Sequence, residues 1–188
     1  MIIYDAETLH AVDTSRGADG WKDFKSMGIS VICAYDYATK HARIFCWDNL
    51  HRFQELIDST DIVAGFNSIL FDNNLCKAHK LHIPQEKVYD IAGAIRIGHG
   101  QKPFYTDSPP PPGLSLDSLC RVNFGIGKPK FGGLAPLMWR DGSYGTVIDY
   151  CMQDVYLTKM LLDRIIEHGK IISPLHKCGA VRVKGPQI

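Results

Sequence analysis

The feature that most constrains this chain is its N-terminal stretch, Ile2–Leu9, in which an apolar run ends in two carboxylates separated by one residue. Side chains alternate between the two faces of a strand, so a strand here would project Asp5 and Glu7 from the same face. Two carboxylates held this close repel each other in a low-dielectric site unless one is protonated or a cation lies between them. Oxygen ligands of this kind favour Mg²⁺ or Mn²⁺. Taken alone, the pattern is also typical of a solvated strand end or a helix cap.

The length and composition indicate one soluble globular domain. The chain has 188 residues, of which 45% are hydrophobic and 22% are charged, and this excludes a disordered or fibrous protein. No apolar run reaches the ~18 residues of a membrane span, and the charges near the N-terminus argue against a signal peptide. The six cysteines form no Cys-x-x-Cys pair, so neither a disulfide framework nor a zinc knuckle is predicted. We expect a cytoplasmic protein that does not bind membranes.

The charge is unevenly distributed along the chain. Residues 121–188 contain ten Lys or Arg against five acids, a net charge of +5, which leaves −4 for the first 120 residues of a chain whose total is +1. This asymmetry would allow a polyanion to lie along the C-terminal part while cations neutralise an acidic site in the N-terminal part. A solvated basic face is the simpler alternative.

The order of predicted elements indicates a mixed α/β fold. Runs rich in β-branched and aromatic residues predict strands over residues 2–9, 28–37, 42–47, 61–65 and 88–91. Helical spacing of apolar residues predicts four helices: one capped by Asp48, one over residues 72–80, one from Ser115 to Gly125, and one from Thr146 to Gly169. In the last helix Asp149 would complete a capping box with Thr146. Its packing stripe is expected to contain Ile148, Cys151, Met152, Val155, Leu162 and Ile166.

Two segments predict loops. Residues 98–113 contain four consecutive prolines, which exclude a helix or a central strand and indicate either a stiff surface loop or a Pro-rich docking peptide. Residues 125–133 are rich in Gly and Lys but lack the spacing of a phosphate-binding loop, so we interpret them as a flexible basic loop.

Two further groups of residues could share a site with Asp5 and Glu7. In the first, a buried strand opens into a helix through Gly65–Asp72, and ligands gather at such strand ends in α/β sheets. In the second, Tyr150 and Asp154 are neighbours on one face of the last helix because they are four residues apart. Taken singly, Asp72 is typical of a helix N-cap, and Asp154 is typical of a salt bridge to Lys or Arg.

In their order and separation, the three groups Asp5-x-Glu7, Asn67-x-x-x-Phe71-Asp72 and Tyr150-x-x-x-Asp154 resemble the three sequence blocks of the DEDD exonuclease superfamily. The tyrosine in the third block resembles the DEDDy branch, because the DEDDh branch has histidine there. Gly65-Phe66-Asn67 and residues 150–157 are similar to the exonuclease domains of family B DNA polymerases and to their stand-alone phage and bacterial relatives. The resemblance implies a ribonuclease H-like fold, with a mixed five-stranded sheet flanked by helices.

The resemblance also implies a function, namely removal of nucleotides from 3′ ends by a mechanism that uses two divalent cations, Mg²⁺ or Mn²⁺. The carboxylates that would hold the cations are those of Asp5, Glu7, Asp72 and Asp154. Tyr150 would orient the attacking water, because a phenol with a pKa near ~10 is a poor base at neutral pH. Four residues would contact the substrate: Thr8, Leu9, Asn67 and Phe71.

The resemblance covers about residues 1–169, which we expect to form the exonuclease domain. Residues 170–188 would be a basic extension in which Ala180–Lys184 adds an edge strand. The expected partners are 3′ ends of single-stranded DNA, together with replication or repair proteins. An exoribonuclease and a catalytically silent nucleic-acid-binding module on the same fold are alternatives, and a zinc protein that uses Cys76, His79 and His82 is a third.

Overall fold

The fold is built on a mixed five-stranded sheet, as expected from the sequence. The computed structural model describes residues 1–13, 15, 20–103, 113–128, 133–175 and 179–187. The strands are β1 (Ile2–Thr8), β2 (Ile29–Asp36), β3 (His41–Phe45), β4 (Val63–Gly65) and β5 (Val88–Asp90), in the sheet order β3-β2-β1-β4-β5. β1 pairs with β2 in antiparallel and with β4 in parallel orientation, and it therefore lies at the centre of the sheet.

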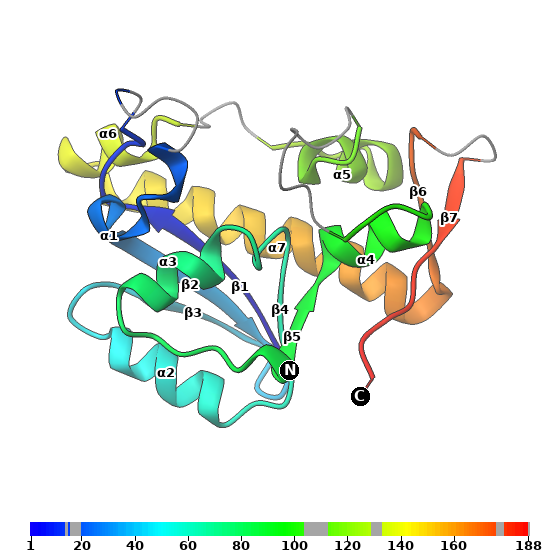
Figure 1. The fold of residues 1–188 in the computed structure, drawn as a ribbon, viewed down its shortest axis with the longest axis horizontal. Helices are drawn as coiled ribbons and strands as arrows, with labels where there is room; N and C mark the ends of the chain where they lie inside the picture. Colours follow the sequence, from blue (N-terminus) through cyan, green and yellow to red (C-terminus); the bar gives the residue numbers. More distant parts are fainter. Residues whose placement is uncertain (14, 16–19, 104–112, 129–132, 176–178, 188) are drawn as a thin grey trace.

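Helices flank this sheet (Figure 1). They are α1 (Phe24–Met27), α2 (Leu50–Asp58), α3 (Asp72–Ala78), α4 (Ile91–Gly98), α5 (Leu116–Phe124), α6 (Ala135–Arg140) and α7 (Tyr144–His168). α7 has 25 residues and packs against both β1 and β2. At a rise of ~1.5 Å per residue it is long enough to cross the whole sheet. The predicted helix from Ser115 to Gly125 is confirmed, with the Ser115 side chain as its N-cap and Gly125 in the left-handed conformation at its end.

The two faces of the sheet have separate cores, and the alternation along β1 decides which residues enter each. Ile3 packs in the core on the α7 side, together with residues of α4, α5 and the C-terminal strands. Ile2 and Tyr4 pack in the opposite core with residues of α2 and α3. Because side chains alternate with period two, Asp5 and Glu7 follow Ile3 and face α7. The sheet therefore directs both carboxylates toward the helix that carries Asp154.

Three details of the helices differ from the sequence prediction. α7 begins one turn earlier than predicted, with Ser143 as its N-cap, so the capping box of Thr146 and Asp149 is wrong. Ile166 is 43% exposed, and the neighbouring Ile165 is buried in its place. The buried stripe of α7 is Val147, Cys151, Asp154, Val155, Leu157, Thr158, Leu161, Leu162 and Ile165.

The structure also differs from the prediction at the N-terminus of α2 and in the presence of α4. The N-cap of α2 is Asn49 and not Asp48; its Oδ1 accepts a hydrogen bond from the Cys46 amide at 2.7 Å. α4 was not predicted, because its first residue, Ile91, was assigned to the preceding strand. The structure ends that strand at Asp90, whose side chain caps α4 by accepting from the Gly93 amide at 3.0 Å. The sequence pattern also does not predict α1 or α6.

The C-terminal residues form a hairpin of their own. β6 (Lys170–Ile172) pairs with β7 (Ala180–Arg182) in a separate two-stranded sheet, so the predicted strand exists but does not extend the five-stranded sheet. Buried and exposed side chains alternate here: Val181 and Val183 are buried, whereas the basic residues Arg182 and Lys184 are exposed. Residues 104–112 of the Pro-rich loop and 129–132 of the basic loop lie outside the described residues. Within the described part of the chain, no helix combines the length and apolar character of a membrane span.

Candidate active site

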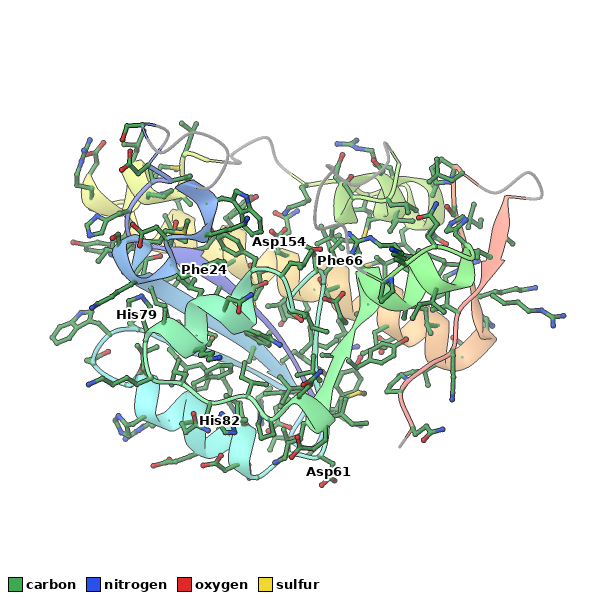
Figure 2. The ribbon with its side chains drawn as sticks, viewed as in Figure 1. Phe24, Asp61, Phe66, His79, His82 and Asp154 are labelled. Atoms are coloured by element: carbon green, nitrogen blue, oxygen red, sulfur yellow. The ribbon has the colours of Figure 1, made fainter. Side chains whose placement is uncertain are left out.

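Three carboxylates from β1 and α7 converge on one point. One ligand oxygen from each of Asp5, Glu7 and Asp154 lies within 4.8 Å of the other two. Mg²⁺–oxygen bonds of about 2.0–2.1 Å hold facing ligands about 4 Å apart, so a small contraction would allow one cation to contact all three. Asp5 and Glu7 are two residues apart on β1 and therefore lie on the same face of the sheet. Asp154 on α7, labelled in Figure 2, is the third carboxylate.

Asp72 joins this site from the start of α3. Its carboxylate is 6% exposed and accepts a hydrogen bond from the Ala6 amide of β1 at 3.3 Å. The N-cap position of α3 is occupied by Phe71, and no side-chain hydrogen bond caps the helix. The alternative in which Asp72 is chiefly a helix cap is therefore wrong. Ala6 lies between Asp5 and Glu7, so this hydrogen bond brings Asp72 beside the cluster, outside the group of three whose oxygens lie within 4.8 Å. Among neighbouring charges, that of Asp72 raises the pKa of Asp5 most.

Burial raises the pKa of each of these acids; neighbouring carboxylates add to the effect for Asp5, Glu7 and Asp72, whereas Lys128 opposes it for Asp154. Burial is the largest cause in every case, and it raises the pKa of Glu7 to about 8 and that of Asp72 to about 7. The pKa of Asp5 lies well above its usual value, because the charges of Asp72, Asp154 and Glu7 add to the effect of burial. The pKa of Asp154 is also raised. The cluster therefore binds protons more tightly than separate carboxylates in water would, and a divalent cation that neutralised its charge would displace those protons.

Among the described residues, one oxygen of Asp154 has no hydrogen-bond partner. Its Oδ2 contacts the Nζ of Lys128, whereas its Oδ1 is buried and unpaired. An unpaired buried carboxylate oxygen is costly, and a coordinated cation removes that cost. The four carboxylates, which include this oxygen of Asp154, therefore form a donor set that fits a magnesium or manganese ion.

Lys128 is a site residue that the sequence analysis missed. It lies after α5 in the segment interpreted as a flexible basic loop, and its Nζ lies 5.3 Å from the centre of the Tyr150 ring. Burial lowers the pKa of Lys128, but the charge and hydrogen bond of Asp154 raise it more, so the ammonium remains charged. The only sign of its role in the sequence is that it is a lysine in a basic loop. Because Lys128 and Asp154 are far apart in the sequence, no local pattern indicates that they are in contact.

The turn between β4 and α3 is held by Asp90 and Arg96. The Asp90 carboxylate accepts from the amides of Asn67 and Ile69, both at 3.1 Å, and Arg96 donates to the Asn67 Oδ1 at 3.2 Å. Asn67 itself has a φ of +62°, in the left-handed region that Asn tolerates better than most residues. These contacts fix both the backbone and the side chain of Asn67, which is one of the predicted substrate-binding residues.

The remaining predicted substrate residues are close in sequence to the site carboxylates Glu7 and Asp72. Thr8 ends β1, and the Leu9 amide that follows donates to the Gly28 carbonyl at 3.3 Å. Phe71 directly precedes Asp72 and packs edge-to-face on Phe24, with ring centres 5.6 Å apart. Their contacts with a substrate remain predictions.

The predicted zinc alternative has no support in the described residues. Cys76 is fully buried, and His79 Nε2 lies 3.1 Å from the Phe24 carbonyl oxygen (Figure 2). Among the residues described here, the His, Cys, Asp and Glu side chains that gather closely enough to hold a metal are those of Asp5, Glu7 and Asp154.

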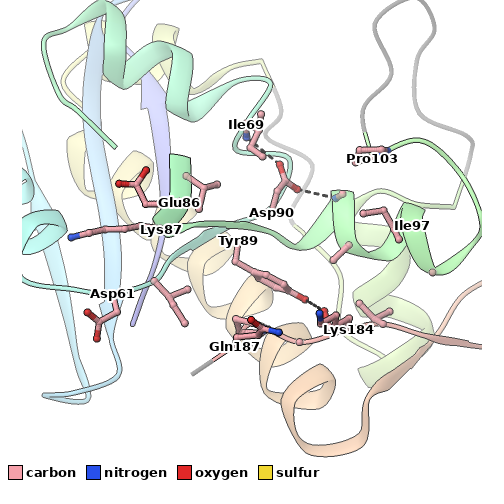
Figure 3. Close-up of a pocket in the computed structure, with 18 of the residues that line it drawn as sticks. Asp61, Ile69, Glu86, Lys87, Tyr89, Asp90, Ile97, Pro103, Lys184 and Gln187 are labelled. Atoms are coloured by element: carbon pink, nitrogen blue, oxygen red, sulfur yellow. Dashed lines mark hydrogen bonds between the residues drawn. The ribbon is translucent and has the colours of Figure 1, made fainter. Parts of the chain in front are cut away.

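A cavity of about 960 Å³ lies against β5 (Figure 3). It is bounded by β5, α4 and the segment that follows β7, where Tyr89 donates to the Lys184 carbonyl at 2.7 Å. Asp90 contributes to its wall, so the residue that holds the Asn67 turn is shared between the cavity and the site.

Comparison with known proteins supports the fold. No protein-family model and no curated protein matches the chain. A similar solved structure is the family B DNA polymerase from the hyperthermophilic archaeon Pyrobaculum calidifontis, with a TM-score of 0.61 at 15% sequence identity. The match covers 88% of this chain and 24% of the polymerase, so the chain spans about a quarter of the polymerase's length. The likeness, with the strand order described above, shows the ribonuclease H-like fold.

Proposed function

We propose that the chain is a metal-dependent 3′-5′ exonuclease of the DEDDy type that acts on single-stranded DNA. The observation that carries this proposal is the convergence of Asp5, Glu7 and Asp154 from two separate elements, with a buried oxygen on Asp154 that has no partner in the described part of the chain. A structural ion pair would not require three carboxylates, since each adds repulsion that only protons or cations offset. We further propose 3′ ends as the binding partner, and replication or repair proteins as associated factors.

The carboxylates would divide between two cations. Asp5, Glu7 and Asp154 would hold one, and Asp5 and Asp72 would hold the other. When bound, the two ions would supply an activated water and stabilise the charge that develops on the phosphate. Lys128 offsets the charge of Asp154 in the metal-free protein. Because a cation would compete for the same carboxylate, metal binding would make the ammonium available to a substrate phosphate.

Tyr150 would orient the attacking water. Burial, followed by the charge of Asp154, raises the pKa of its phenol above the usual value. The phenol therefore keeps its proton at neutral pH and acts as a hydrogen-bond donor, not as a general base. Thr8, Leu9, Asn67 and Phe71 would hold the terminal nucleotide through polar contacts and base stacking.

The test is degradation of 5′-labelled single-stranded DNA and RNA with Mg²⁺, with Mn²⁺ and with EDTA. A ladder that shortens from the 3′ end only with metal is expected, and faster loss of RNA would indicate an exoribonuclease. Asp5→Ala and Asp154→Ala should abolish degradation, while Tyr150→Phe should slow it less because it removes one hydrogen bond and no metal ligand. Asp58→Ala, on the exposed end of α2, is the matched control.

Two results would contradict the proposal. Activity of Asp5→Ala close to that of the wild type would remove this residue from the metal site. Metal-independent binding of DNA without degradation would favour the catalytically silent module.

A further inference from the structure

A row of three aromatic side chains begins at the residue that precedes Asp72 and ends at the surface. It consists of Phe71, Phe24 and Trp21, and we call it the aromatic row. Phe24 packs edge-to-face on Phe71, with ring centres 5.6 Å apart, and Trp21 packs edge-to-face on Phe24 at 6.2 Å. Phe71 is adjacent in sequence to Asp72, while Trp21 at the other end is 37% exposed. The row therefore connects a proposed metal ligand with solvent.

α1, which carries Phe24 in the middle of this row, is fixed by hydrogen bonds to residues after β1 and after α3. The His10 amide, just beyond the end of β1, donates to the Met27 carbonyl of α1 at 2.8 Å. On the other side, His79 after α3 is hydrogen-bonded to the Phe24 carbonyl oxygen at 3.1 Å. Met27 is buried in the core on the α2 and α3 side. α1 is thus held between the strand that carries Asp5 and Glu7 and the helix that begins with Asp72 (Figures 1 and 2).

Positive charge accompanies the aromatic rings. The Lys22 Nζ lies 5.5 Å from the centre of the Trp21 ring, and the side chains of Lys22 and Lys25 are exposed. Aromatic faces bordered by lysines are the combination that binds single-stranded nucleic acid, since bases stack on the rings and phosphates pair with the ammonium groups. Packing of α1 on α3 accounts for Phe24 and Phe71, but it does not require a tryptophan that leaves more than a third of its surface in water.

We propose that the aromatic row binds the single strand upstream of the 3′-terminal nucleotide, with Trp21 stacking on the base of the second or third nucleotide and Lys22 and Lys25 contacting its phosphates. This inference rests on the proposed function, because it assigns the strand that leaves the catalytic site to this surface. A duplex end cannot use the surface until it frays, since paired bases are already stacked on one another. The aromatic row thereby favours single-stranded 3′ ends.

The test compares two substrates. An oligothymidylate of eight nucleotides can reach Trp21, whereas the p-nitrophenyl ester of thymidine 5′-monophosphate fills only the terminal-nucleotide position. Trp21→Ala should lower kcat/KM for the oligonucleotide about tenfold, the loss expected for one stacked base, and leave the ester unchanged. Trp21→Phe should recover part of the loss. Trp47→Ala, which alters an 81% exposed tryptophan beyond β3, should affect neither substrate.

Abasic substitution locates the stacked base. Omitting the base of the second or third nucleotide should weaken wild-type activity on the oligonucleotide, and the same omission should have no effect in Trp21→Ala. Equal losses of Trp21→Ala on both substrates would show a purely structural role and overturn the inference. Unchanged activity on both would overturn it too.

The experiment distinguishes failure of this inference from failure of the proposed exonuclease function. If the wild type cleaves neither substrate, the exonuclease assignment fails, and fluorescence anisotropy of the labelled oligonucleotide in EDTA then tests the aromatic row. Weaker binding by Trp21→Ala, and a smaller salt dependence for the double variant Lys22→Gln and Lys25→Gln, would support the surface. Binding equal to that of the wild type would refute it.

Discussion

Replacing Asp72 by Asn should stabilise the metal-free protein at pH 8, although it should also impair the proposed catalysis. The Asp72 side chain is 6% exposed, and its carboxylate accepts from the Ala6 amide at 3.3 Å. Burial raises its pKa from 3.8 to about 7; the backbone amides of Asp72 and Ala6 oppose this effect, and the charges of Asp90 and Asp154 add to it. Asparagine keeps the shape and the acceptor oxygen but carries no charge, so it removes the cause of the shift.

The sign and size follow from the two pKa values. Above pH 3.8 the unfolded chain loses the Asp72 proton, whereas the folded protein keeps it up to about pH 7. The free energy of unfolding therefore falls between pH ~4 and ~7, and it stays low above pH 7. A shift of about 3 pKa units corresponds to roughly 4 kcal/mol. Because neighbouring carboxylates redistribute part of the charge, we expect Asp72→Asn to gain about 2 kcal/mol, or about 4–8 °C in Tm.

The assay is denaturant unfolding of both proteins in EDTA at pH 4, 6 and 8, repeated at pH 8 with millimolar Mg²⁺. The difference should be near zero at pH 4, reach its full size by pH 8, and shrink with Mg²⁺, because cation binding stabilises the wild type more. Asp61→Asn, an exposed acid before β4, is the control and should show no such trend. A variant less stable than the wild type in EDTA at pH 8 would refute the reasoning.

Three further predictions concern the residues that hold the site. Lys128→Met should destabilise the metal-free protein by roughly 3 kcal/mol, because it leaves the buried Asp154 carboxylate without its cation, and Mg²⁺ should restore most of the loss; equal losses in EDTA and Mg²⁺ would contradict this. Asp90→Asn should raise KM for oligonucleotides more than it lowers kcat, since it loosens the amide contacts of Asn67, and steady-state kinetics would show it. Gly65→Ala should lower the Tm, because an added Cβ would lie 2.6 Å from the Ser68 Cβ; an unchanged melting curve would disprove that clash.

The local sequence pattern was sufficient to predict several elements of the structure. The five strands were recognisable because β-branched and aromatic runs bounded by turns are a short-range signal. Ser115 and Gly125 marked both ends of α5 through capping chemistry that depends only on adjacent residues. The period of two placed Asp5 and Glu7 on one face, but it did not identify what that face would meet.

Local pattern failed where a neighbour distant in sequence decided the outcome. Asp72 looked like a helix cap, yet its carboxylate accepts from the Ala6 amide, 66 residues away. The start of α7 was misplaced because Thr146 and Asp149 make a plausible box within the sequence, whereas the helix continues through them to pack on α6. The pattern does not predict α4, because Val88–Ile91 has the composition of a strand and only the contact of the Asp90 side chain with the Gly93 amide shows that a helix begins there.

The sequence by itself determined the chemistry available to this protein, that is, four carboxylates and a tyrosine at separations that a sheet and a long helix can bring together. Only the tertiary structure decided that Asp5, Glu7 and Asp154 converge within 4.8 Å, that Lys128 lies against Asp154, and that one oxygen of Asp154 finds no partner among the residues that the structure describes. The physical reason is that burial and charge are properties of the packed site. A carboxylate acquires a raised pKa only when folding removes its water and places other charges beside it.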